Sequence, residues 1–334
     1  MRIIVLSIAL AYGIFTAQAQ DKITKVFNHA DLGVVLGTTG IGFDVAMPIH
    51  NMVKLRAGFD FMPRFNYNMH FGVESFDGKV TTAPIEKMSD ALYGLTGFKV
   101  NQSVTMKGKP TMWNFKFMVD VYPFKNKHWH VTAGFHWGPS KFAEAVNAQE
   151  DAPSLFAVGM YNHLWSVAWD NYNGIPTPIY IEGYDEDGTP YGPTLDYEIR
   201  SRLLSYGRMG IPLGKYKEDV MDAEGNVIHE KGETYYMQPN ENSMVSAVAR
   251  SNSFKPYVGF GYEGRLIKGN NDYKIGFDAG LMFWGGTPDI LTHDGTNLSK
   301  DVEDINGKVG DYVKFIKGIK VFPVLNLRIT RRIF

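Results

Sequence analysis

Strict alternation between large apolar residues and small or polar residues recurs along the chain. From Ile41 to Met47 every odd position is large and apolar, whereas the even positions are Gly, Asp and Ala. This period of two places neighbouring side chains on opposite faces of an extended strand. Eight segments show it, and each predicts a strand: 31–37, 41–47, 53–61, 113–121, 129–137, 256–262, 273–283 and 325–330.

The polar face of these strands combines glycine with charge. Small residues beside long charged ones suit the crowded interior of a narrow closed barrel rather than the solvated face of a soluble sandwich. The opposite face is apolar and has Trp113, Trp129 and Trp137 near strand ends, which suits lipid and an interfacial aromatic girdle. The glycines that share the charged face are Gly33, Gly37, Gly42, Gly58, Gly134, Gly259, Gly261, Gly276 and Gly280.

The connections between the strands differ in length on the two sides of the predicted sheet. Those on one side are short, at 48–52, 122–127 and 267–272, whereas three on the other side are long, at 63–110, 138–253 and 285–318. Short periplasmic turns and long external loops are the asymmetry of an outer-membrane barrel. The sequence therefore predicts an all-β fold, an antiparallel up-and-down transmembrane β-barrel with eight strands.

The segment 138–253 is too long for a structureless loop, so we expect it to contain structure of its own. Val220 to Val227 reads as a hairpin with its turn at Glu224-Gly225-Asn226. In the first long loop, Pro84 to Leu95 reads as a short helix. If strands from the long loop join the barrel wall, the count rises to about 10–12.

The first residues predict export. Met1-Arg2 precedes a short apolar run, and Ala17-Gln18-Ala19 is a small-x-small triplet, which together make a secretory signal peptide cleaved after Ala19. The expected parts are a signal peptide over 1–19 and a barrel domain over 20–334. The sequence has no cysteine, so neither a lipoprotein anchor nor a disulfide is expected, and a net charge of −1 implies no nucleic-acid partner.

Charged residues on the predicted interior face are balanced in sign. The acids are Asp31, Asp44, Asp60, Asp120, Glu263 and Asp278, and the bases are Lys54, Arg56, Lys116, Lys255, Lys274 and Arg328. Residues equidistant from a tight turn lie opposite each other. The turn centres therefore predict three facing pairs: Asp44 with Arg56, Asp120 with His130, and Glu263 with Lys274.

A buried charge without a partner costs several kcal/mol, so this balance predicts a closed ionic network that fills the lumen. A gated pore or a proton path is the functional alternative, although eight strands leave an interior only wide enough for side chains. The candidate site is this lumen network: Asp44, Arg56, Asp60, Lys116, Asp120, His130, Glu263, Lys274, Asp278 and Arg328.

Other motifs point to no cofactor, metal site or enzyme. The glycine pattern of Gly259 to Gly264 lies within an alternating strand and no helix follows, as a dinucleotide site requires. His128, His130 and His136 lack further ligands in the pattern and are interpreted as lumen or rim histidines. Asp185 to Gly188 reads as an acidic turn. The sequence contains no cysteine nucleophile, no Gly-x-Ser-x-Gly and no His-Glu-x-x-His.

Together with the signal peptide, four segments resemble the small outer-membrane barrels of Gram-negative bacteria, the group that includes outer membrane protein A-like and OmpW-like proteins. The segments are 36–61, 113–137, 256–284 and 323–334. The resemblance implies an outer-membrane location, contact with outer-membrane lipid, and a terminal aromatic residue that the barrel-insertion machinery reads, here Phe334. The functions of these barrels are diverse, and function lies in sites carried by a fold.

Three functional hypotheses remain open. The first is a non-enzymatic outer-membrane barrel with a structural or surface-interaction role, whose aromatic-rich external loops contact an unknown extracellular ligand. The second is a narrow porin or small-molecule channel. The third is a soluble periplasmic β-barrel that binds an apolar ligand inside, which requires apolar residues on the interior face.

Overall fold

The computed structural model describes residues 29–76, 89–90, 92–94, 97–174, 181–184, 186–194, 197–305 and 307–333. The expected signal peptide and the terminal Phe334 lie outside these ranges. Of the expected helix between Pro84 and Leu95, the described residues 89–90 and 92–94 are helical.

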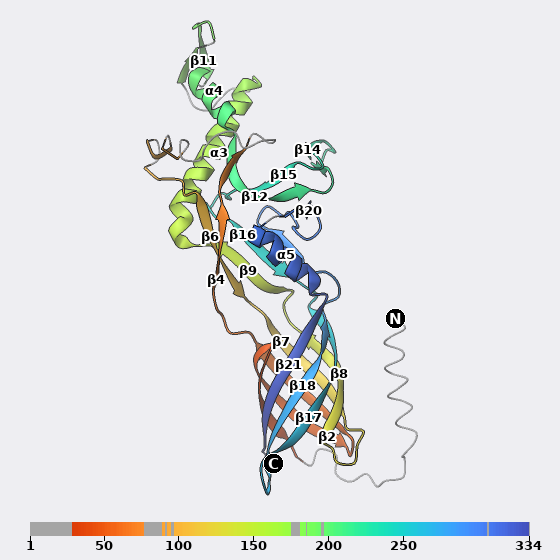
Figure 1. Cartoon of the computed structure of the whole chain (residues 1–334). Helices are drawn as coiled ribbons and strands as arrows, with labels where there is room; N and C mark the ends of the chain where they lie inside the picture. Colours follow the sequence, from red (N-terminus) through yellow and green to blue (C-terminus); the bar gives the residue numbers. More distant parts are fainter. Residues whose placement is uncertain are drawn as a thin grey trace.

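Eight antiparallel strands form a closed barrel, at the lower end of the view in Figure 1, and their order around the wall is their order in the sequence. All eight coincide with predicted strands, so the predicted fold class is confirmed. The strands are β1 (Asp31–Gly37), β2 (Gly40–His50), β3 (Val53–Phe61), β7 (Trp113–Val121), β8 (Trp129–Trp137), β17 (Phe254–Ile267), β18 (Asn270–Phe283) and β21 (Val321–Arg332). Pairing of β1 with β21 closes the ring.

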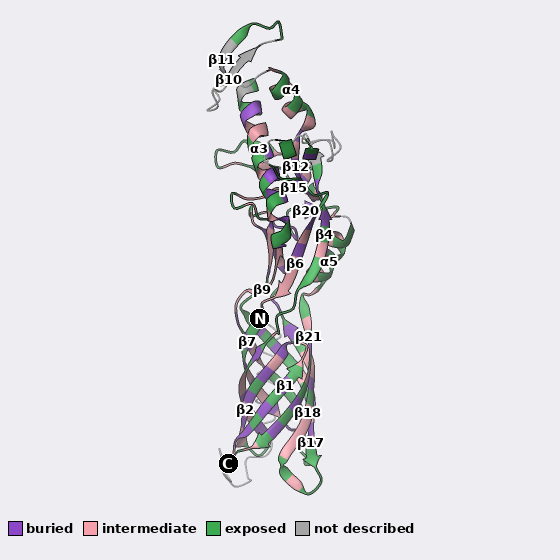
Figure 2. Ribbon diagram, turned by 90° about the vertical axis from the view of Figure 1, so that its left-hand side faces the viewer, coloured by how far each residue is buried: buried purple, intermediate pink, exposed green. Residues whose placement is uncertain are grey.

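Burial alternates along the barrel strands, as the stripes in Figure 2 show. In β3, Arg56 and Asp60 are buried in the lumen, whereas Phe59 and Phe61 are exposed on the outer wall. The polar face therefore points inward and the apolar face outward. This arrangement contradicts the third hypothesis, since a barrel that holds an apolar ligand inside needs the reverse.

Glycines on the inner face let the strands and the lumen side chains approach closely. A Cβ on Gly58 would lie 2.2 Å from the backbone oxygen of Phe43, and one on Gly134 would lie 2.2 Å from the backbone oxygen of Phe117. Larger residues at these two positions would force neighbouring strands apart. This is the physical reason why glycine and charge share one face.

The three long connections of the barrel do not form separate loops. The described parts of 63–110, 138–253 and 285–318 fold together into a second unit above the barrel, here called the upper domain (Figure 1). Its larger sheet has five strands in the order β19 (Asp289–Thr292), β16 (Ser246–Arg250), β9 (Lys141–Asn147), β6 (Ser103–Pro110) and β4 (Tyr67–Gly72). None of these strands joins the barrel wall, so the count there stays at eight.

A smaller sheet of the upper domain is built around β12 (Arg208–Tyr216). It pairs with β15 (Thr234–Met237), β20 (Val302–Glu303) and β5 (Glu74–Phe76). Two hairpins project from the domain, β10 (Ile181–Tyr184) with β11 (Pro190–Thr194), and β13 (Val220–Met221) with β14 (Val227–His229). The second confirms the predicted hairpin.

Helices complete the upper domain. They are the short helix η1 (Gln149–Asp151), α3 (Ala152–Tyr172), α4 (Tyr197–Tyr206) and α5 (Gly307–Gly318). In the part of the chain that the structure describes, no helix is both long enough and apolar enough to cross a membrane. Helix α5 leads directly into β21, which places it at the upper rim of the barrel (Figure 1).

The upper domain has a hydrophobic core of its own. Residues from both sheets and from α3 and α5 are buried in one cluster, including Val104 of β6, Leu155 of α3 and Met209 of β12. The amide of Asn162 on α3 fixes the helix to β12, since it donates to the Met209 carbonyl oxygen at 2.8 Å and accepts from the Met209 N–H at 2.8 Å. Long-range packing therefore orders the long connections, in which the sequence pattern predicted a hairpin and a short helix but no common core.

Candidate functional site: a charged lumen below an apolar pocket

Arg56 of β3 lies at the centre of the lumen and joins three strands. Its Nη1 is 2.7 Å from Oδ2 of Asp278 on β18, and its Nη2 is 2.9 Å from Oδ1 of Asp120 on β7. Asp278 also bonds Nε2 of His130 at 2.9 Å, and Asp120 accepts from the hydroxyl of Thr132 at 2.7 Å. All five residues are buried. A charge removed from water is tolerated when it is paired and hydrogen-bonded in this way.

A second group of ion pairs lies towards the lower end of the lumen. Glu263 of β17 accepts from Nη2 of Arg328 at 2.8 Å and from Nζ of Lys54 at 2.9 Å. Lys274 Nζ is 3.2 Å from Glu263 and 3.1 Å from Asp31. One carboxylate thus holds cations from three other strands.

The third group lies on the upper side of Arg56. Lys116 of β7 donates to Oδ1 of Asp60 at 2.7 Å, and its Nζ is 3.6 Å from Asp44. Asp44 is also 3.7 Å from Nη1 of Arg328, which connects this group to the lower one. All ten residues of the predicted lumen network therefore lie inside the barrel, in two sets of direct contacts. Arg56, Asp120, Asp278 and His130 form one set. The other set consists of Asp44, Asp60, Lys116, Arg328, Glu263 and Lys274.

The predicted facing pairs are wrong in register. Asp44 lies opposite Gly58 rather than Arg56, and Asp120 lies opposite Thr132 rather than His130. Glu263 lies opposite Gly276, although its ion pair with Lys274 forms across the diagonal. Each true turn centre lies one residue further along the chain than predicted, which shifts the pairing by two residues and keeps every side chain on the predicted face.

Neutral polar residues complete the lumen, and charge counting did not identify them. Asn114 of β7 accepts from Lys255 Nζ at 3.3 Å, and both residues are buried. Thr132 is bonded to Asp120 as described above. Asn114 and Thr132 lie on the polar face of predicted strands, and this position is the sequence signal that could have identified them as lumen residues. His136 is buried beside Asp60, 3.8 Å from Oδ2.

The histidines of β8 and the preceding turn lie apart from any metal-binding arrangement. His128 Nδ1 is bonded to the Glu263 backbone oxygen at 2.7 Å, whereas His130 is bonded to Asp278. Among the described residues, no three His, Cys, Asp or Glu side chains are grouped so that they could hold a metal ion. Gly259 to Gly264 lies within β17, which pairs with β8 and β18 and leads into a turn rather than a helix.

An apolar cluster closes the upper mouth of the barrel. Trp284, directly after β18, is buried and stacks on Phe322 of β21 at 5.3 Å between ring centroids, and on its other side it contacts Phe142 at 4.5 Å. This mouth cluster consists of Met112, Met118, Tyr257, Met282, Trp284 and Val324. It lies between the charged lumen and the upper domain.

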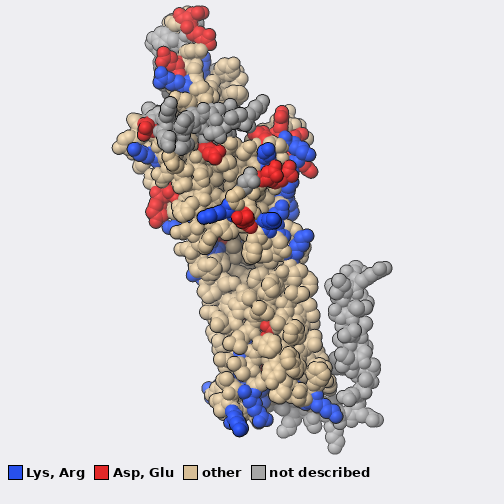
Figure 3. Space-filling model, viewed as in Figure 1, with Lys and Arg blue, Asp and Glu red and all other residues tan. Residues whose placement is uncertain are grey.

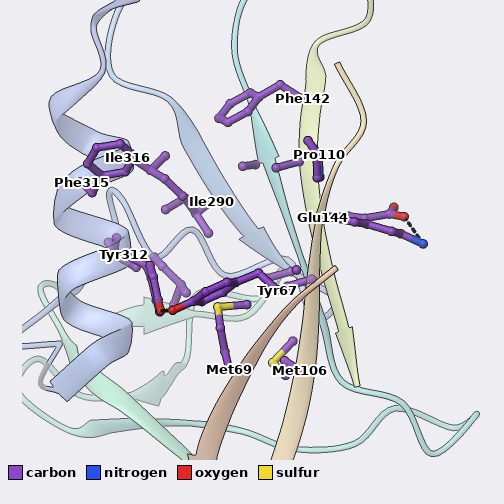
Figure 4. Close-up of a pocket in the computed structure, with 18 of the residues that line it drawn as sticks. Tyr67, Met69, Met106, Pro110, Phe142, Glu144, Ile290, Tyr312, Phe315 and Ile316 are labelled. Atoms are coloured by element: carbon purple, nitrogen blue, oxygen red, sulfur yellow. Dashed lines mark hydrogen bonds and ion pairs between the residues drawn. The ribbon is translucent and has the colours of Figure 1, made fainter. Parts of the chain in front are cut away.

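Above the mouth cluster lies an apolar pocket of about 430 Å³. The five-stranded sheet, with β4 at its edge, bounds the pocket on one side and α5 on the other (Figure 4). No member of the lumen network lines it. A separate polar pocket of about 360 Å³ opens at the lower end of the barrel, where Lys54, Glu263 and Lys274 line it. The two pockets share no lining residue, and the buried side chains of the lumen network lie between them.

Comparisons with known proteins leave the family open. No family model matches the sequence, and a comparison with curated proteins gives no match. Among solved structures, crystal structures of Acinetobacter baumannii CarO2 and CarO are similar to the chain. For CarO2 the identity is 12% and the TM-score 0.36, covering 92% of this chain and 100% of CarO2. For CarO the values are 12%, 0.35, 93% and 99%. Values this low assign neither a family nor a function.

Proposed function

We propose that this protein spans the outer membrane through its barrel and acts at the cell surface through its upper domain, without enzymatic activity. One observation carries the proposal: a closed ring of eight strands has a buried charged interior and an exposed apolar wall. A wall of exposed Phe, Leu, Val and Ile is unfavourable in water but matches the hydrocarbon region of a bilayer.

Aromatic residues at the two ends of the wall support membrane insertion. Near the upper end, Trp113 stacks on Phe59 at 5.5 Å, and near the lower end Trp129 contacts Tyr262 at 5.1 Å. Figure 3 shows a barrel wall with almost no charge on the side in view, with Lys and Arg gathered at its lower end. Tryptophan and tyrosine favour the membrane–water interfaces, whereas charge is excluded from the region between them.

This arrangement also favours one orientation. The barrel turns at the lower end are short, whereas the upper domain is built from the three long connections. In outer-membrane barrels the short turns face the periplasm, so the upper domain would lie outside the cell. Outer-membrane lipid, an unknown extracellular ligand and the barrel-insertion machinery, with Phe334 as its signal, are the partners that this proposal implies.

A filled lumen favours anchoring over conduction. Ion pairs occupy the lumen from Asp31 near its lower end to Asp60 near its upper end, and the mouth cluster covers the upper end. A channel would require both barriers to open. The narrow-porin alternative therefore predicts current across a planar bilayer, whereas our proposal predicts none for the wild type and none for Arg56→Ala, in which the mouth cluster remains.

Fractionation and gel mobility test the membrane part of the proposal. We expect the protein in the outer-membrane fraction, with a band that migrates differently with and without boiling. Recovery from the soluble periplasm with no heat-dependent shift would contradict it.

Deletion tests the division into anchor and surface domain. Removing 138–253 alone would remove β9 and β16 and expose the remaining core, so all three upper segments must be replaced together by short turns. We expect this minimal barrel to insert and to keep its heat-dependent shift. Failure of the minimal barrel to insert would show that the barrel needs the upper domain in order to fold, and this would contradict the division into anchor and surface domain.

A further inference from the structure

The apolar pocket of the upper domain owes its existence to small residues in the middle of a sheet. Gly108 of β6 lies beside Ala145 of β9, which lies beside Ala247 of β16. The next row has Ala143 beside Ala249. All five line the pocket. A helix that packs on a sheet normally meets large side chains, which interdigitate and leave few voids. Here the side chains at the centre of the sheet are small, and they form one side of the pocket, here called the floor. Helix α5 lies opposite the floor.

The walls around this floor are apolar and adaptable. Five methionines line the pocket: Met62, Met69, Met106, Met112 and Met237. Methionine is flexible and polarizable and fits ligands of irregular shape. Phe142 and Trp284 form the lower end, towards the barrel. The volume of about 430 Å³ is within the range of small-molecule sites.

The two charged residues that line the pocket, Lys109 and Glu144, pair with each other at 2.7 Å and so offer no unpaired charge to a ligand. Glu144 is the one acid that lines it, and Figure 4 shows this side chain on the far side of the strands from α5, where it pairs with Lys109 and Lys141. The hydroxyls of Tyr67 on β4 and Tyr312 on α5 also line the pocket, and they bond each other at 2.8 Å (Figure 4). An ionised or strongly polar ligand would lose its hydration here without compensation.

One side of the pocket leads to the barrel wall. Phe315, Ile319 and Phe322 line both this pocket and a second, more open hollow at the foot of α5. That hollow is also lined by Val321 and Pro323 of β21, which lie on the outward-facing side of the strand. An apolar surface therefore runs from the outer wall of the barrel, past the foot of α5, into the pocket.

We infer that the apolar pocket binds the hydrocarbon chain of a lipid or of a single-chain amphiphile, which enters past the foot of α5 from the outer face of the membrane. The inference rests on the proposed membrane location. The polar head of such a molecule would stay outside, at the level of the upper rim, while its methylenes replace water over the row of small residues. Burial of methylenes drives binding of this kind, and each buried methylene raises the affinity by about fourfold.

Photolabelling of the full-length protein in phosphatidylcholine vesicles tests this inference. One sample receives free palmitate with a diazirine in its chain, and the other contains phosphatidylcholine that carries the same chain. Adducts are mapped by peptide mass spectrometry. Adducts on pocket residues from the phospholipid would identify a bilayer lipid as the source, and adducts from free palmitate alone would identify a single-chain amphiphile. Either result supports the inference.

Ala247→Phe fills the pocket from its floor, and Ala223→Phe in the exposed turn between β13 and β14 is the matched control. A phenyl group occupies the space of several methylenes, and the loss of only two from the pocket already lowers affinity by about tenfold. We therefore expect pocket adducts to fall by about tenfold or more in Ala247→Phe and to stay unchanged in Ala223→Phe. Ala145→Leu is the milder variant if Ala247→Phe does not fold. The heat-dependent band shift reports folding in each case.

Adducts on the barrel wall distinguish failure of this inference from failure of the proposed membrane location. Adducts on outward residues such as Leu325 with none in the pocket would overturn the inference and leave the proposed function intact. Equal pocket labelling in Ala247→Phe and the wild type would also overturn it. Absence of adducts on the barrel wall would instead contradict the membrane location itself.

Discussion

Replacing Arg56 with alanine removes the cation that two buried carboxylates share. In the native lumen its guanidinium lies 2.9 Å from Asp120 and 2.7 Å from Asp278, and both acids are buried. The variant leaves Asp120 with the hydroxyl of Thr132 and Asp278 with His130. Neither remaining partner supplies the charge that the guanidinium did, so two negative charges stay in a small volume without compensation.

Removal of one partner from a buried ion pair costs about 3–5 kcal/mol. We expect Arg56→Ala to lose about this much unfolding free energy. The triple variant Arg56→Met, Asp120→Asn, Asp278→Asn should recover most of it, because replacing a whole buried ionic group with neutral residues of similar size is often neutral or stabilising. Arg265→Ala, at the exposed lower end of β17, should change stability by less than about 0.5 kcal/mol.

Urea titration in lipid vesicles, read by the heat-dependent band shift, measures these differences. The single, triple and control variants are compared at one pH and one lipid composition. A loss below about 1 kcal/mol in Arg56→Ala would refute the reasoning, because a value that small is typical of a solvent-exposed pair. A triple variant as unstable as the single one would show that size and packing of the arginine, rather than charge pairing, dominate.

Three further predictions address the barrel wall and the upper domain. Gly58→Leu should prevent insertion, since its Cβ would lie 2.2 Å from the Phe43 backbone oxygen, and the outer-membrane yield measures this. Asn162→Ala should destabilise the upper domain by about 1–3 kcal/mol, because β12 loses a buried hydrogen-bonding partner, and limited proteolysis measures it. Burial alone would raise the pKa of Asp294, but hydrogen bonds led by the Thr292 hydroxyl hold the pKa of this carboxyl below its ordinary value of 3.8. A lowered folded-state pKa gives stability that is present above the ordinary value and lost as the pH falls through the folded one. The protection of upper-domain amides, measured as the exchange rate relative to that of an unfolded chain at the same pH, should therefore fall below about pH 4 in the wild type and fall less in Asp294→Asn.

Much of the barrel could be predicted from local pattern alone. Alternation with a period of two specifies which side chains share a face, because successive residues of a strand point in opposite directions. The positions of Arg56, Asp60 and Asp278 inside the barrel follow from that rule. Exposed aromatics such as Trp113 follow from it as well. The eight wall strands were predicted in the same way, but whether strands from 138–253 would join them was left open, and only the closed ring decided it.

Register is the first property that local pattern left open. A shift of two residues preserves both faces, so alternation is equally compatible with Asp44 opposite Arg56 and with Asp44 opposite Gly58. Turn geometry decides between them: the pairs Asp44 with Gly58 and Pro48 with Lys54 are centred on Asn51, one residue beyond the predicted centre at His50. Ion pairs such as Arg56 with Asp278 join residues far apart in the sequence, so only the closed ring specifies them.

The upper domain and its pocket were decided by tertiary structure. Its five-stranded sheet draws strands from all three long connections. The pairings of β6 with β9 and of β16 with β19 join different connections, and they form only when the closed barrel brings those connections together. Gly108, Ala145 and Ala247 are unremarkable within their own segments, and they become the floor of a pocket only when they align across three strands. Alternation along the chain determined which side chains face outward and which face the lumen. Long-range strand pairing determined where the pocket lies, because the residues that line it are neighbours in space but far apart in the sequence.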